Sequence, residues 1–116
     1  MRPPFARRLR PLAPNVPTLP AGLSHPVGWV GYLNRGTLFV KRMTYDPKQN
    51  YPDGGVNYET FTTEGMLEME SLGPLVRLAP GQAVEHVETW SLHRGPAEAK
   101  SEAELDAVAK IAAGGR

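Results

Sequence analysis

The chain contains no cysteine, which excludes disulfide bonds and thiolate chemistry. No hydrophobic run approaches the ~18 residues of a membrane-spanning helix, and the N-terminus has arginines but no apolar segment typical of a secretory signal. Glycine-rich phosphate loops, Ser-His-Asp order and clusters with metal-ligand spacing are also absent, so neither a cofactor nor a metal is predicted. Because neither a membrane-spanning run nor a secretory signal is recognised, the cytoplasm is the default expectation and no membrane partner is predicted.

Acidic residues are absent from the first 45 residues. No Asp or Glu precedes Asp46, whereas seven Lys or Arg do, and the remainder carries all 12 acids against six bases. An excess of basic residues in one part of a chain is typical of proteins that bind an anionic partner. No nucleic-acid recognition motif accompanies these bases. Solvated charges are therefore the favoured interpretation, and a nucleic-acid partner is not expected.

Proline is concentrated at the N-terminus, where six of the 12 prolines lie within the first 20 residues. Because proline lacks an amide donor and fixes φ, neither a helix nor a central strand fits this spacing. We therefore predict three regions. They are a Pro/Arg-rich extended arm over 1–26, a β-sandwich segment over 27–94, and a linker with a C-terminal helix over 95–116.

Aromatic and β-branched residues are frequent from Gly28 onward, which is typical of strands. Asn34-Arg35-Gly36 predicts a hairpin loop, Asp53-Gly54-Gly55 a tight turn, and Pro80-Gly81 a corner. We predict antiparallel strands at 28–33, 37–43, 56–61, 66–71, 74–78 and 83–93. The residues expected to be buried are Val30, Leu38, Val40, Val56, Leu67, Met69, Leu75, Val76, Val84, Trp90 and Leu92, together with Trp29 and Phe39.

One helix is predicted, near the C-terminus. Ser101 and Glu104 have the capping-box spacing, in which the serine accepts the amide of residue 104 and the glutamate reaches back. A narrow apolar stripe follows at Leu105, Val108, Ala109 and Ala112, and Gly114-Gly115 ends the helix. The predicted fold class is all-β, an antiparallel partial β-sandwich with a proline-rich arm and a short C-terminal helix.

Two motifs carry a family resemblance, Asn57-Tyr58-Glu59-Thr60 in a predicted strand and Leu78-Ala79-Pro80-Gly81-Gln82 before the last strand. They resemble the closing segment of the galactose mutarotase-like (aldose 1-epimerase-like) superfamily. In that group a Leu-Glu-Thr-type motif presents a catalytic glutamate, and a Leu-x-Pro-Gly-Glu turn leads into the last strand. Over Gly28–Arg94 the chain is most similar to an uncharacterised bacterial family of that superfamily. The resemblance implies a supersandwich fold with a carbohydrate-binding or epimerase-like function.

Glu59 is the residue that the resemblance marks as catalytic. In the mutarotases this glutamate takes the proton of the anomeric hydroxyl, while a histidine protonates the ring oxygen. Strand alternation places Asn57, Glu59 and Phe61 on one face, where an acid beside an aromatic ring suits a sugar. Phe61 stands where the mutarotase motif usually has Gln. A role for Glu59 as a solvated or cross-strand acid is an equal alternative.

Glu68 and Glu70 lie two residues apart on one predicted strand, so both carboxylates point the same way. Such a pair can bind sugar hydroxyls, bind a hard cation or take part in acid/base chemistry. The alternative is that both acids simply lie on a solvated face of the sheet, and this is the favoured interpretation. His86 pairs with one of these acids if the last strand lies beside theirs. The candidate ligand-binding residues are therefore Asn57, Glu68, Glu70 and His86.

The histidine acid of the family has no counterpart in this chain. In the family the catalytic histidines lie on much earlier strands of a chain more than twice as long. The histidines here are His25, His86 and His93, and none matches. The function is therefore either that of a sugar-binding domain, incomplete as a catalyst, or that of a structural and interaction remnant of the fold. An uncovered sheet face and edge predict either a homo-oligomer or a missing N-terminal half.

Overall fold

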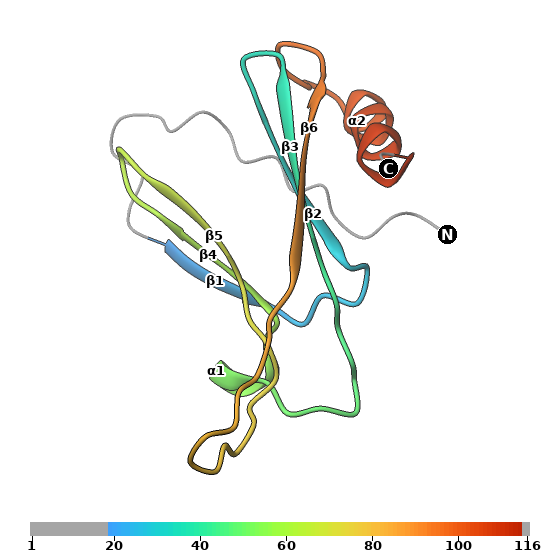
Figure 1. Ribbon diagram of the computed structural model, residues 1–116. Coiled ribbons are helices and arrows are strands. Elements are labelled where there is room, and N and C mark those ends of the chain that lie inside the picture. The colour runs from blue at the N-terminus through green and yellow to red at the C-terminus, as the bar shows by residue number, and fades with distance from the viewer. Residues whose placement is uncertain (1–18, 115–116) are drawn as a thin grey trace. The chain divides into compact units, whose positions relative to one another are not determined.

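The structure is a computed structural model that describes residues 19–114 (Figure 1). Residues 1–18, which include most of the predicted arm, lie outside the described residues. Strands predominate among the elements, and a longer helix lies near the C-terminus. The elements are β1 (Leu19–Leu23), β2 (Trp29–Asn34), β3 (Thr37–Met43), α1 (Pro52–Gly55), β4 (Tyr58–Thr62), β5 (Leu67–Ser71), β6 (Glu88–Arg94) and α2 (Glu102–Gly114).

The described strands form two three-stranded sheets, with the orders β1-β4-β5 and β2-β3-β6. The pairs β1–β4, β4–β5 and β2–β3 run antiparallel. The prediction of an all-β, antiparallel fold with a short C-terminal helix is therefore confirmed. The chain divides into two compact units. Of the described residues, 29–42 and 88–114 form the α2 unit, and 19–28 and 43–87 form the β4 unit.

The hairpin of β2 and β3 lies in the α2 unit. Asn34 pairs with Thr37, so the loop consists of Arg35 and Gly36, whose φ angles are 49° and 80°. Two successive residues with positive φ match the type I′ turn, whose twist fits the flanking strands. The Gly36 carbonyl also accepts a hydrogen bond from the Gly95 amide at 3.0 Å. The predicted hairpin loop is confirmed.

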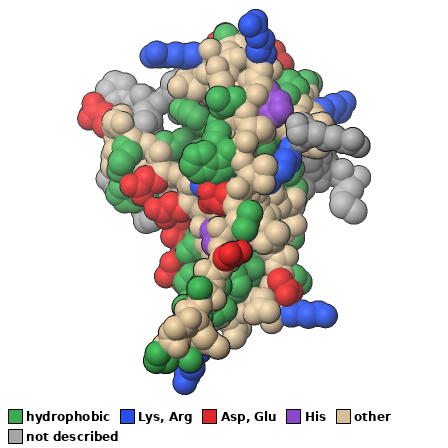
Figure 2. Space-filling model, viewed as in Figure 1, with side chains coloured by type: hydrophobic (Ala, Val, Ile, Leu, Met, Phe, Trp, Pro, Cys, Tyr) green, Lys and Arg blue, Asp and Glu red, His purple; other side chains and the backbone are tan. Residues whose placement is uncertain are grey.

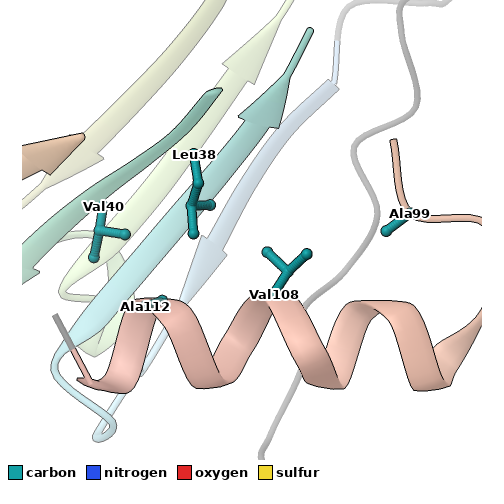
Figure 3. Packing of buried hydrophobic residues seen from close by; sticks show 5 residues of the cluster. All are labelled: Leu38, Val40, Ala99, Val108 and Ala112. Carbon is teal, nitrogen blue, oxygen red and sulfur yellow. The ribbon is translucent and has the colours of Figure 1, made fainter. Parts of the chain in front are cut away.

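The hydrophobic core of the α2 unit lies between β3 and α2 (Figure 3). Leu38 and Val40 alternate on β3, so both point to the same face, and both are almost completely buried. They cluster with Ala99, Val108 and Ala112. Because residues four apart on a helix lie one above the other, Val108 and Ala112 present one stripe to the sheet. This is part of the apolar stripe that the sequence predicted.

The helix α2 begins with the predicted capping box. The Glu104 amide donates to Ser101 Oγ at 3.2 Å, and the Ser101 amide donates to Glu104 Oε2 at 3.2 Å. These reciprocal bonds satisfy amides at the helix start that would otherwise have no partner. The helix has 13 residues, and among the described residues no helix is long and apolar enough to cross a membrane.

The sheet of the β4 unit has β4 in its centre, between β1 and β5. Residues 19–23, within the segment predicted as an extended arm, therefore form a strand. In the described structure β1 pairs on one side only, with β4. An edge strand tolerates a residue without an amide donor, which accounts for Pro20. The proline spacing excluded a central strand but not an edge strand.

Two turns of the β4 unit have the predicted positions. In the turn before β4, Asp53, Gly54 and Gly55 all have positive φ, of 52°, 80° and 98°. At the corner, the Gln82 amide donates to the Ala79 carbonyl at 3.0 Å, with Gly81 at a φ of 83°. Proline followed by a positive-φ glycine is the type II arrangement. The Gln82 side chain accepts the Ala79 amide in return, at 3.0 Å.

The segment between β5 and β6 contradicts part of the strand prediction. Residues 74–78 form no strand, and the last strand begins at Glu88 rather than at residue 83. A strand needs a neighbour that satisfies its backbone amides and carbonyls. Within the described sheets, neither 74–78 nor 83–87 has a neighbouring strand. Apolar content alone was therefore a misleading signal in this segment.

The predicted core is correct only in part. Leu38 and Val40 are buried. Half-buried side chains are found at Trp29, Val30, Phe39, Val56, Leu67 and Met69. The exposed members of the prediction are Leu75, Val76, Val84, Trp90 and Leu92. The first three of these lie outside any strand, and the other two lie on β6 at a sheet edge, so the described residues give none of the five a covered face.

Candidate functional site

An acid-bearing face is formed by β4 and β5. Glu59 lies directly opposite Glu70, and Phe61 lies opposite Glu68. Because directly opposed residues of antiparallel strands point to the same face, these four side chains share one face of the sheet. Figure 2 shows acidic side chains gathered over the surface where these strands lie. The pairing register thus brings together three of the five predicted site residues.

Glu59 interacts with two other carboxyl groups. Asp53, in the turn before β4, hydrogen-bonds to it, and Glu70 faces it from β5. The pKa of Glu59 is raised, first by the hydrogen bond with Asp53, then by desolvation and by the negative charges of Asp53 and Glu70. A carboxyl group with a raised pKa keeps its proton to a higher pH than an ordinary glutamate. Below this raised pKa Glu59 carries a proton and can donate a hydrogen bond, whereas above it the carboxylate only accepts.

Phe61 gives the same face an apolar part. Its side chain is half-buried, and it lies on the strand of Glu59 and opposite Glu68. Carboxyl groups bind hydroxyls through hydrogen bonds, and an aromatic ring offers a flat apolar surface. The face therefore suits a ligand that is rich in hydroxyl groups and has an apolar side.

Asn57 is completely buried just before β4. Its Nδ2 donates to the His25 carbonyl at 2.9 Å, and its Oδ1 accepts the His25 amide. The backbone carbonyl of Asn57 accepts the Leu72 amide at 2.9 Å. The side chain thus engages both backbone groups of one residue and ties the segment after β1 to the start of β4. Asn57 positions the strand of Glu59, and its amide is directed at the backbone.

His86 lies beside Ser71, whose Oγ is 2.8 Å from His86 Nε2. Ser71 is opposite Tyr58 in the ladder, so its side chain belongs to the face that alternates with that of Glu59. The ring also lies against Gly73, where an added Cβ would be 3.2 Å from Nδ1. The structure therefore connects His86 to β5 through Ser71.

Tyr58 is buried on the sheet face that alternates with the face of Glu59. Burial raises its pKa to about 12, and the negative charge of Glu70 adds to the shift. Its ring centre is 6.5 Å from that of His25, and the two planes are tilted by 51°. A phenol with this pKa stays neutral at physiological pH. Tyr58 therefore acts as a packing residue beneath the acidic face.

The α2 unit contains a charged cluster that sequence patterns did not predict. Lys41 Nζ lies 3.1 Å from Glu88 Oε1, and the lysine side chain is only 8% exposed. Trp90 Nε1 donates to Glu88 Oε2 at 2.8 Å, and Lys41 Nζ lies 5.7 Å from the Trp90 ring centre. Phe39 packs edge-on against the same ring at 5.7 Å. The available signal was a lysine inside a strand otherwise rich in apolar residues.

Within residues 19–114, no group of three or more His, Asp or Glu side chains has the arrangement needed to hold a metal ion. The carboxylates of the acidic face can accept hydrogen bonds, and a protonated carboxyl group can also donate one. Comparisons with protein families, with characterised proteins and with solved structures find no match to this chain.

Proposed function

We propose that the chain is a carbohydrate-binding domain of the galactose mutarotase-like kind, with its sugar site on the face of Glu59, Phe61, Glu68 and Glu70. The observation that carries the proposal is the register of β4 and β5, which brings three acids and an aromatic ring to one face. The resemblance of the motif at 57–60 supports it, because the motif singles out the same glutamate.

Each side chain has a distinct role in the proposed site. Glu59 and Glu70 are directly opposed, so together they can bind one hydroxyl or two adjacent ones, and Glu68 lies two residues further along β5. Phe61 packs against the apolar face of the sugar ring. The bound hydroxyls replace the acid-to-acid contacts that raise the pKa of Glu59. Asn57 and His86 act indirectly, through the strands that they hold.

This face is proposed to bind a sugar without completing the epimerase reaction. Proton transfer at the anomeric carbon needs a base on one side of the ring and an acid at the ring oxygen. Glu59 can supply the base once it is deprotonated. The strands β1, β4 and β5 contain no histidine to supply the acid, which the family resemblance assigns to a histidine on a much earlier strand.

A structural or interaction domain without sugar chemistry is the second candidate, and one observation favours it. Large hydrophobic side chains are exposed between residues 75 and 92, in the β4 unit at Leu75, Val76, Leu78, Val84 and Val87, and in the α2 unit at Trp90 and Leu92. Exposed apolar residues at this density are typical of surfaces that bind another protein. These residues lie outside β4 and β5, so the two functions can be tested separately.

The test of sugar binding is an NMR titration of amide chemical shifts with D-galactose, D-glucose and D-mannose, up to about 50 mM to detect weak affinity. We expect shifts at the amides of β4 and β5 that disappear in Glu59→Gln and persist in Glu64→Gln. Glu64 is a matched control because it is exposed in the loop between the same strands. The absence of shifts with every sugar, or an unchanged response in Glu59→Gln, would refute the proposal. Polarimetry should show no acceleration of mutarotation.

A further inference from the structure

The outer edge of β6 has features that natural proteins usually protect. β6 pairs with β3 on one side, and no described strand lies on its other side. Trp90 on this strand is 65% exposed and Leu92 is 70% exposed. An edge strand with free backbone groups and large exposed apolar side chains is a template for pairing with another strand. This edge is independent of the proposed sugar site, which lies in the β4 unit.

The apolar side chains of β6 point to the sheet face opposite α2. Alternate residues from Glu88 to Arg94 share one face. The ion pair of Lys41 with Glu88 and the edge-on packing of Phe39 with Trp90 show that this face is that of Phe39. Phe39 alternates with the β3 residues that pack on α2. The face therefore presents acidic, aromatic, aliphatic and basic side chains in that order along β6.

We propose that two copies of the chain pair through β6, antiparallel and around a two-fold axis at Ser91. In this register Glu88 of each copy faces Arg94 of the other, and Trp90 faces Leu92. The strand is thus complementary to itself, because each acid meets a base and each aromatic ring meets an aliphatic side chain. The two sheets join into one continuous sheet, in which the Trp90 and Leu92 side chains cover each other.

The neighbouring registers are less favourable. With the axis at Trp90, Glu88 faces Leu92, and Arg94 has no partner within the strand. With the axis at Leu92, Arg94 faces Trp90, and Glu88 lies opposite no residue of the other copy's β6. Of these three registers, only the one with its axis at Ser91 gives every one of the seven β6 residues a partner and matches both charge and apolar character. The sequence of β6 therefore favours a second copy of the same chain as the partner at this edge.

Cysteine cross-linking tests the register, because the chain has no cysteine of its own. The two-fold axis places the Ser91 Cβ atoms of the two copies about 4.5–5.5 Å apart, as in other directly opposed pairs. The two Thr89 residues are separated by four residues along the strands, or about 13 Å. Under mild oxidation of the full chain, Ser91→Cys should give a disulfide-linked dimer and Thr89→Cys should not. Equal cross-linking of both variants, or none in either, would overturn the proposal.

Sedimentation velocity tests the charge matching without altering the cluster around Lys41. The wild-type chain should show a monomer–dimer equilibrium, and Arg94→Glu should weaken dimerisation about tenfold or more, because it places acids opposite acids at both ends of the interface. Arg77→Glu is the matched control, since Arg77 is exposed outside β6 and should leave the equilibrium unchanged. A wild-type monomer at every concentration, or an Arg94→Glu variant that dimerises like wild type, would refute the interface.

Discussion

Replacing Asn57 by alanine is expected to lower the free energy of unfolding by about 2–3 kcal/mol. The substitution removes the hydrogen bonds to the amide and the carbonyl of His25. Each buried polar group left without a partner costs about 1–3 kcal/mol, so two groups give roughly 2–6 kcal/mol. His25 is only half-buried, so water can reach it in part, and the lower end of that range applies. The lost contact also frees the segment that follows β1.

Urea unfolding followed by far-ultraviolet circular dichroism measures this loss. Asn50→Ala is the matched control, because the Asn50 side chain is exposed and its backbone carbonyl, which accepts the Leu75 amide, is retained. The control should stay within about 0.5 kcal/mol of wild type. Hydrogen exchange should also accelerate at the amides around His25 in Asn57→Ala. A loss no larger than that of the control would show that the buried amide contributes no net stability.

Three further predictions concern individual interactions. Lys41→Met leaves the Glu88 carboxylate without its buried partner and should destabilise the protein by on the order of 3 kcal/mol in thermal or urea unfolding. The raised pKa of Tyr58 means that its neutral form stabilises the fold fully below about pH 10, and that this contribution, about 2–3 kcal/mol, is lost as the pH rises through about 12. Urea titrations across that range should show a smaller alkaline loss in Tyr58→Phe than in wild type or Tyr45→Phe. Ser101→Ala removes the capping hydroxyl and should cost about 1 kcal/mol.

Features fixed by neighbours in the sequence were predictable. The capping box of α2 needs residues three apart, and the hairpin loop at Arg35-Gly36 needs two residues with positive φ, so both are determined locally. The shared face of Glu68 and Glu70 likewise follows from alternation within one strand. Their grouping with Glu59 depends on the register of a short hairpin, which alternation alone does not specify.

Features that depend on distant partners were not predictable. The apolar residues of 74–78 resemble a strand, but the described structure gives them no neighbouring strand. β1 is the opposite case, because its proline disfavours a strand, yet the segment forms one by pairing with β4. Asn57 was predicted as a ligand group from its position beside Glu59. Its bonds to His25, 32 residues away in the chain, could not be inferred from the sequence.

The division of the chain into two interleaved units couples the stability of one unit to that of the other. The α2 unit consists of 29–42 and 88–114, and the β4 unit consists of 19–28 and 43–87. Because these segments alternate along the chain, cleavage of a single peptide bond cannot separate the two units intact. Pairing of β3 with β6 closes a loop that consists of residues 44–87, and the entropic cost of that closure grows with the length of chain left flexible. Ordering of the β4 unit shortens the flexible part of this loop. A cleavage or an unfolding event in the β4 unit therefore lowers the stability of the α2 unit, although the helix α2 and the core residues packed on it all lie outside the β4 unit.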